Sequence, residues 1–290
     1  MTRRVSAAGT GAHRNWSRKL FPNDLGQLFV VDGGNSYYRD DVDRAKRYTV
    51  NAGVFSGNNF IGSWDNSGLG INDGDYHSHY VKQFFFSATP VIGLEAQVGG
   101  IYPLRGEATE FTTFDDDGYL MGERLSVRRP KALYVDELSV TRALLGPSNE
   151  PNLFDRFERW SDPNYMQVLA TKRFSSVVAG SADYTRLAGA DTLYFGISLR
   201  FQPTAVVTGL RYEQYYRFNA TEASGFAVTV ERPIARGARV QGGYATVDER
   251  YGNLNADRIQ RGRRFFAIGT LPLRGPLSAG FYVTQALHSP

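Results

Sequence analysis

The sequence predicts an all-β protein whose antiparallel strands close into a barrel of roughly 14 strands, within a range of about 12 to 16. Three observations carry this prediction. Apolar and polar residues alternate along many segments. Most of these segments are about 9 to 12 residues long, whereas soluble strands average about 5 to 6. Glycine, tyrosine and phenylalanine are abundant, at 31, 17 and 19 residues, which fits tight turns and interfacial rings.

Residues 192–201 show the alternation most clearly. Every second residue from Leu193 to Phe201 is apolar, and the residues between them are largely polar. Because successive side chains of a strand point to opposite faces, this segment separates two environments. The apolar face would meet a core in a soluble sheet, and lipid in a membrane barrel whose polar face meets water.

Comparable segments run along the rest of the chain. Strong alternation recurs, in order, in residues 48–55, 93–102, 119–127, 206–218, 226–231 and 277–287. Weaker candidates fill the intervals at residues 29–38, 80–88, 133–144, 165–174, 177–187, 239–247 and 264–273. In 119–127 one residue breaks the pattern, because Glu123 falls on the apolar side.

The connections between these segments differ in length. Short ones at 188–191, 233–237 and 274–276 carry Gly, Pro and Asp. Long polar ones cover 57–79, 146–163 and 248–263, and the pattern 147–160 could form a short amphipathic helix. We therefore expect long loops on one rim, with 57–79 and 146–163 folding inward. The predicted barrel covers 27–290, and residues 1–26 form a polar segment that is disordered or periplasmic.

Composition narrows the protein classes. No stretch approaches the roughly 20 apolar residues of a spanning helix, a requirement that a barrel does not have. The absence of cysteine excludes disulfides and thiolate metal sites. The net charge of +4 is spread evenly, so we expect no nucleic-acid partner. Residues 1–18 lack the apolar core of a signal peptide, which an exported barrel needs.

Taken together, residues 27–287 resemble outer-membrane β-barrels of the porin kind. The resemblance is one of class and rests on the long alternating strands, the aromatic residues and the glycine-rich turns. It implies a bacterial outer-membrane location and contact with membrane lipid. The chain departs from the class at its last residue, Pro290, where such barrels usually carry an aromatic.

Charged residues on the polar faces are the candidate pore lining. Rows of arginine and carboxylate across a lumen bias the choice of ions, and an excess of arginine favours anions. The alternative is that these charges neutralise one another and hold the wall together. The candidates are Arg124, Arg128, Arg200, Arg211, Arg217, Arg239, Glu95, Asp183, Glu213 and Glu231.

The sequence gives weaker support for metal binding, catalysis or sugar binding. Residues 65–75 and 115–118 carry clustered oxygen donors, but they lack the ligand spacing of a calcium loop. His77 and His79 are too few for a metal site. No Gly-x-Ser-x-Gly motif marks a nucleophile. Several aromatic residues fit an interfacial girdle or a lipid-facing surface: Tyr37, Tyr38, Tyr80, Phe84, Phe86, Tyr212, Tyr215, Tyr216 and Phe218. The alternative is a sugar-stacking track along the lumen at Tyr194, Tyr215 and Tyr282. We therefore expect no cofactor, no metal and no enzyme activity.

The predicted function is that of a porin-like channel for passive diffusion of small polar or anionic solutes. Three alternatives stay open: an export barrel for a secreted polymer, a soluble β-rich binding protein, and a barrel-embedded hydrolase. Assembly into a homo-oligomer is left open as well.

Overall fold

The computed structural model describes residues 17–22, 28–43, 45–56, 79–113, 120–128, 134–145, 162–202, 206–234, 237–251, 261–272 and 278–287. They form one 15-stranded antiparallel sheet, in which each strand pairs with its neighbours in chain order. The strands are β1 (Ser17–Pro22), β2 (Leu28–Asp41), β3 (Tyr48–Ser56), β4 (His79–Val91), β5 (Leu94–Ile101), β6 (Leu120–Val127), β7 (Glu137–Leu145), β8 (Tyr165–Arg173), β9 (Val178–Leu187), β10 (Ala190–Arg200), β11 (Gly209–Arg217), β12 (Ala223–Pro233), β13 (Arg239–Val247), β14 (Gly262–Pro272) and β15 (Ser278–Leu287).

The sheet confirms the all-β, antiparallel prediction. Each of the predicted segments overlaps one of the strands from β2 to β15. The additional strand, β1, lies within residues 1–26 and pairs with β2. Its sequence, Ser-Arg-Lys-Leu-Phe-Pro, has no period-2 alternation, so the pattern offered no sign of it.

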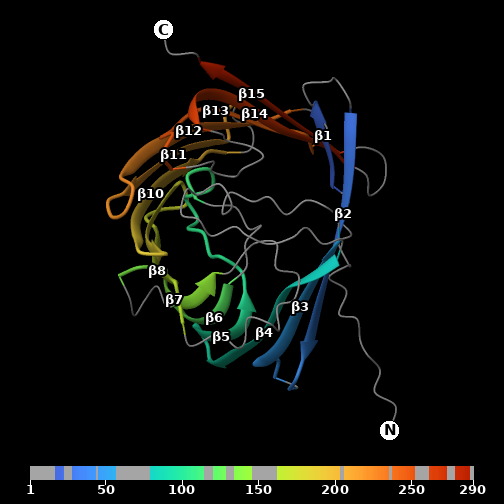
Figure 1. Ribbon diagram of the computed structural model, residues 1–290, viewed down its shortest axis with the longest axis vertical. Coiled ribbons are helices and arrows are strands. Elements are labelled where there is room, and N and C mark those ends of the chain that lie inside the picture. The colour runs from blue at the N-terminus through green and yellow to red at the C-terminus, as the bar shows by residue number, and fades with distance from the viewer. Residues whose placement is uncertain are drawn as a thin grey trace.

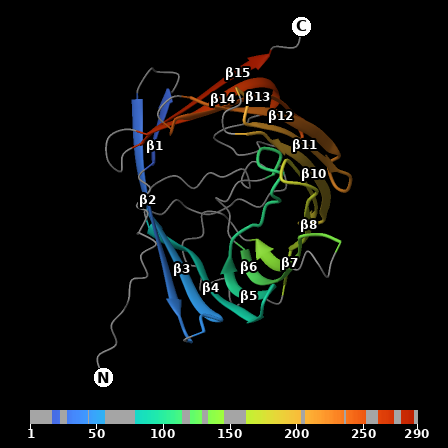
Figure 2. The same cartoon turned by 180° about the vertical axis from the view of Figure 1, so that it is seen from behind.

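The sheet curls until its first and last strands approach each other (Figures 1 and 2). The hydrogen-bonded order runs from β1 to β15, and no β15–β1 pair occurs among the described residues. The curvature gives the sheet a convex and a concave face. The part of the chain that is described contains no helix of the length and apolar character needed to cross a membrane.

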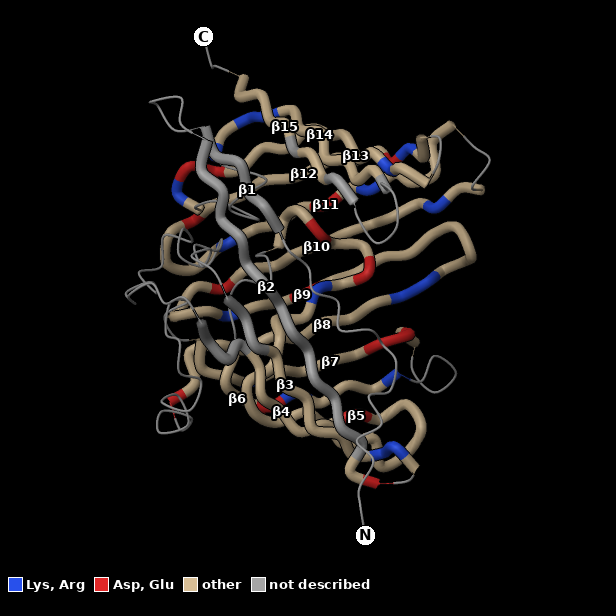
Figure 3. Tube along the Cα trace, turned by 90° about the vertical axis from the view of Figure 1, so that its right-hand side faces the viewer, with Lys and Arg blue, Asp and Glu red and all other residues tan. Residues whose placement is uncertain are grey.

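The antiparallel order assigns every connection to one of two rims, between which the strands run in Figure 3. The long connections 57–78, 102–119, 146–164 and 248–261 all share one rim, here called the long-loop rim. The opposite, short-turn rim carries 42–47, 92–93, 128–136, 174–177, 201–208 and 234–238. The tight turn at Ala188 and Gly189, both at positive φ, lies on the long-loop rim despite its brevity.

The two faces differ in polarity. Exposed apolar side chains alternate along the strands on the convex face and include Phe84, Phe86, Phe195, Ile197, Leu210, Tyr212, Tyr216, Phe265, Phe281 and Val283. The residues between them, such as Thr192 and Ser198 in β10, are buried on the concave face. Alternation therefore produces a sheet with its apolar side outward, the reverse of a soluble sheet.

Candidate functional site

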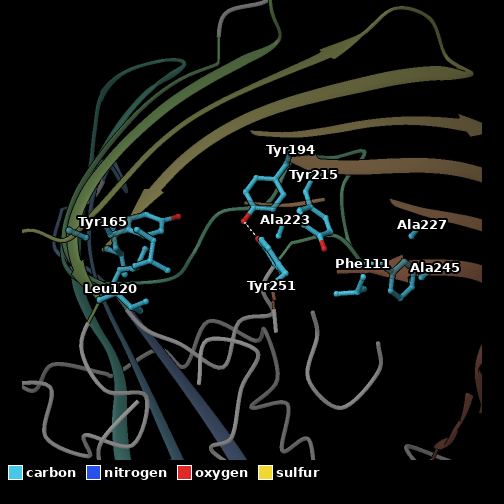
Figure 4. Packing of buried hydrophobic residues seen from close by; sticks show 14 of the residues in the cluster. Phe111, Leu120, Tyr165, Tyr194, Tyr215, Ala223, Ala227, Ala245 and Tyr251 are labelled. Atoms are coloured by element: carbon cyan, nitrogen blue, oxygen red, sulfur yellow. Dashed lines mark hydrogen bonds between the residues drawn. The ribbon is translucent and has the colours of Figure 1, made fainter. Parts of the chain in front are cut away.

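A segment that connects β5 to β6 lies against the concave face. We call residues 102–113 the inner segment. Ala108, Phe111 and Thr112 are buried, although they belong to a connection and not to a strand. The Phe111 ring packs on Phe266 of β14, with 4.9 Å between the ring centroids. Phe111 belongs to the same buried cluster as Ala227 of β12 and Ala245 of β13, which Figure 4 shows in the interior.

Glu213 of β11 is the main anchor of the inner segment. Its Oε2 accepts hydrogen bonds from the backbone N–H groups of Glu110, Phe111 and Thr112, at 2.7, 2.8 and 3.0 Å. The Thr112 hydroxyl donates a fourth at 3.1 Å. Glu213 is fully buried. A carboxylate that accepts several N–H groups is a strong, charge-assisted attachment, so β11 holds this turn of the inner segment in place.

Further strands hold the rest of the inner segment. The Arg124 guanidinium of β6 donates to the Tyr102 carbonyl. Gln167 Nε2 of β8 donates to the Leu104 carbonyl at 2.8 Å, and Ser181 Oγ of β9 accepts from the Ala108 N–H at 3.0 Å. These hydrogen bonds therefore attach the segment to four separate strands, β6, β8, β9 and β11.

Gly196 of β10 leaves room for this attachment. A Cβ atom at this position would lie 2.2 Å from the Ala108 carbonyl oxygen, closer than any real side chain approaches. The inner segment can therefore lie against β10 only because residue 196 has no side chain.

Arginines cluster on the concave face toward the short-turn rim. Arg173 and Arg200 both pair with Glu107 of the inner segment, and the Arg200–Glu107 distance is 3.2 Å. Arg128 pairs with Glu95 at 2.8 Å and with Glu137 at 3.0 Å. In each pair the cation is the more exposed partner. The arginine side chains are 49–59% exposed, whereas the carboxylate side chains are 22–23% exposed.

A mainly polar hollow of about 430 Å³ lies between the ends of β10 and β13. It is lined in part by Arg200, Arg211, Arg239, Glu231 and Gln241. Arg211 also pairs with Glu110 of the inner segment. The hollow therefore lies where the arginine cluster meets the turn that Glu213 holds.

Three polar atoms from adjacent strands at this hollow lack a hydrogen-bond partner among the described residues. They are Ser198 Oγ, Arg211 Nε and Thr229 Oγ1. Ser198 lies opposite Arg211, and Arg211 lies opposite Thr229. An unsatisfied buried polar group costs about 1–3 kcal/mol, so this part of the wall favours water or a polar solute nearby.

Near the long-loop rim, aromatic side chains pack together over the concave face. Tyr194 and Tyr251 hydroxyls lie 2.5 Å apart, and the Tyr215 ring packs on Tyr251 at 4.1 Å between centroids (Figure 4). Arg217 stacks on Tyr251 at 4.6 Å and donates to the carbonyl of Arg250. Burial raises the pKa of Tyr251 well above its usual value, which keeps its hydroxyl protonated.

This packing corrects one expectation for the aromatic residues. Tyr194 and Tyr215 are buried at 2% and 0% exposure, so they offer no open surface for stacking a sugar, and Tyr215 is not part of an outer girdle. The Tyr282 side chain lies outside the described residues. Phe84, Phe86, Tyr212, Tyr216 and Phe218 are exposed, as an outward girdle requires.

Strand register places the ten predicted charged residues on one face. Residues directly opposite each other on neighbouring strands, such as Asp183 and Tyr194 or Ser198 and Arg211, point to the same face of the sheet. Four of the ten are buried and form hydrogen bonds with other residues of the chain: Arg124, Asp183, Glu213 and Arg217. The others lie nearer the short-turn rim, where Glu95 accepts from Arg128 and Glu231 from Gln241.

Several residues of this site carried little signal in the sequence. Glu107 and Glu110 lie in a segment without alternation, so nothing in the pattern marked them. Arg173 falls in a weakly alternating segment, where its phase relative to Tyr165 could have placed it on the polar face. The connections 57–78 and 146–161, the donor clusters 65–75 and 115–118, the helix predicted at 147–160 and His77 lie outside the described residues, as does the His79 side chain.

Comparisons by sequence found no relatives. No family model matches the chain, and no curated protein matches it either.

Comparison with solved structures is informative. The chain is similar to a triple mutant of Rhodopseudomonas blastica porin, with 10% identity, a TM-score of 0.54 and coverage of 93% of this chain and 91% of that one. It is also similar to Acinetobacter baumannii OccAB4, with 10% identity, a TM-score of 0.51 and coverage of 89% and 75%. A third similar structure is Pseudomonas aeruginosa OccK8 (OprE), with 10% identity, a TM-score of 0.50 and coverage of 84% of this chain and 74% of that one. The chain therefore has a porin-like fold.

Proposed function

We propose that the chain is a closed barrel in a bacterial outer membrane and forms a channel for passive diffusion of small polar solutes, with a preference for anions. The approach of the first and last strands supports closure (Figure 1). The exposed apolar side chains of the convex face support contact with lipid, because a membrane barrel turns its apolar residues outward. The porin-like fold supports the location and the channel role.

The unequal exposure within the ion pairs of Arg128, Arg173 and Arg200 carries the proposed anion preference. The carboxylates are recessed against the wall or the inner segment, while the guanidinium groups of Arg128, Arg173 and Arg200 extend into the open space. A solute in the lumen therefore meets positive charge first, although the pairs are close to neutral overall. Charge arranged in this way along a pore selects ions by sign.

The inner segment supplies the narrowing of the proposed channel. It projects from the long-loop rim into the concave side and is held there by Glu213. Solutes would then pass on the open side of the inner segment, next to the exposed guanidinium groups of Arg173 and Arg200 that flank Glu107. The wall sets the diameter and the arginines set the charge preference, and no bond is made or broken.

The proposal is tested by recording purified protein in planar lipid bilayers under a gradient of potassium chloride. We expect stepwise current increases and a reversal potential whose sign shows that chloride passes more readily than potassium. Raising the salt concentration should weaken this preference, because screening shortens the reach of the arginines. Absence of current steps would contradict the channel, and a potassium preference would contradict the role given to the arginines.

A further inference from the structure

The hollow between the ends of β10 and β13 is lined by hydrogen-bonding groups that the described chain leaves unused. Ser198 and Thr229 are 5% and 3% exposed, and neither hydroxyl has a partner among the described residues. The same holds for Arg211 Nε, which the register places between them. A hydroxyl reorients by rotation about the Cα–Cβ bond, so both can point into the hollow that they line.

The charges around the hollow leave positive charge in excess. Its lining includes three arginines and one glutamate. Arg200 and Arg211 each pair with a carboxylate of the inner segment, and Glu231 accepts a hydrogen bond from Gln241 at 3.4 Å. Arg239 is exposed and has no ion-pair partner in the part of the chain that is described. This guanidinium beside unused donors favours an anionic ligand.

A phosphate ester matches this set of donors better than a carboxylate does. A carboxylate has two oxygens in one plane, which a single guanidinium satisfies by a bidentate contact. A phosphate ester has three terminal oxygens that point in different directions, and it carries a charge of about −1.5 to −2 at neutral pH. It therefore accepts from several sides, as a row of two hydroxyls and one guanidinium across three strands requires.

The hollow also has room for an organic group attached to the phosphate. Its volume of about 430 Å³ lies within the roughly 300–1,000 Å³ of pockets that hold small organic ligands. Glu231 and Gln241 add a carboxylate and an amide to the lining. Their oxygens are acceptors, so they suit the hydroxyl groups of a polyol.

We propose that this hollow binds the phosphate monoester of a small polyol. The phosphate accepts hydrogen bonds from Ser198, Thr229 and Arg211 Nε and pairs with Arg239, and the polyol hydroxyls donate to the carboxylate and the amide. The site names a solute class for the channel and rests on the proposed water-filled lumen, since the hollow opens on the concave face.

Isothermal titration calorimetry of the purified protein in detergent tests the ligand class with four matched probes. They are glycerol 3-phosphate, inorganic phosphate, glycerate and glycerol. We expect glycerol 3-phosphate to bind most tightly and glycerate to bind about tenfold or more weakly, because it offers fewer oxygens. Equal affinity for glycerate would overturn the phosphate assignment, and equal affinity for inorganic phosphate would overturn the ester. No binding of glycerol 3-phosphate would overturn the site.

The double variant Ser198→Ala with Thr229→Val tests the site without changing any charge. The affinity for glycerol 3-phosphate should fall by about tenfold or more, because two hydrogen bonds to a charged group are lost. Thr284→Val is the matched control, since it removes another unpartnered hydroxyl, on β15 and outside the hollow. Wild-type affinity in the double variant would overturn the proposal.

Two further measurements keep this test independent of folding and of conduction. Thermal unfolding of the double variant should match the wild type, because both lost hydroxyls lack partners. If it unfolds earlier, Arg239→Gln serves instead, as its side chain is exposed, and unchanged affinity there would overturn the site. Binding without current steps in bilayers would count against the channel, whereas current without binding would count against this site alone.

Discussion

Replacing Glu213 with alanine is expected to release the 110–112 turn of the inner segment and raise single-channel conductance. The substitution removes the acceptor of three backbone N–H groups and of the Thr112 hydroxyl. Each buried N–H left without a partner costs about 1–3 kcal/mol. The free energy of unfolding should therefore fall by about 3 kcal/mol or more, and the turn at residues 110–112 should move away from β11 while the contacts with β6, β8 and β9 remain.

Conductance in bilayers and thermal unfolding measure this effect. Glu222→Ala is the charge control, because it removes the same charge from the exposed connection between β11 and β12, outside the hollow and away from the contacts of the inner segment. We expect the control to keep the wild-type conductance and stability. Equal conductance in Glu213→Ala and the wild type would show that the inner segment does not narrow the passage.

Replacing Arg200 and Arg239 together with glutamate is expected to reverse the ion preference from chloride to potassium. Both residues line the hollow near the short-turn rim, and the Arg200 side chain is 59% exposed. The double substitution exchanges two positive charges for two negative ones at the same mouth, beside the acidic Glu107 and Glu231. The local field then changes sign, while the backbone contacts of the inner segment to Glu213 remain.

The reversal potential under a salt gradient measures this change. Arg232→Glu is a suitable control, since Arg232 lies beside Glu231 in β12 but on the opposite, convex face. We expect the control to retain chloride preference. A double variant that still prefers chloride would mean that the arginines of the hollow do not set selectivity.

Period-2 alternation was sufficient to predict most of the sheet. In β10, the same residues that alternate in the sequence alternate between burial and exposure, as Phe195 and Ile197 are exposed while Thr192 and Ser198 are buried. The pattern even located Glu123 on the apolar side, where the structure has it. Strand pairing preserves such local information, because side-chain direction depends on the position within the strand alone.

The inner segment could not be predicted in the same way. Its position depends on contacts between residues far apart in the chain, such as Glu213 with the turn at 110–112. The residues of the segment show no periodicity, and their backbone N–H groups, which any sequence would supply, make the main attachment. The roles of Arg217 and Tyr215 were hidden for the same reason, since both depend on packing with Tyr251 from a distant turn.

The proposed channel depends most directly on which face of the sheet meets the conducting water. The chain has no cysteine, so single cysteines can be labelled without background. Gln241 lines the hollow, and Val240, its neighbour in β13, points to the other face. A charged, membrane-impermeant thiol reagent should reduce the current through Gln241→Cys and leave Val240→Cys unchanged. Equal responses at the two positions, or block at Val240→Cys alone, would contradict a water-filled lumen along the concave face.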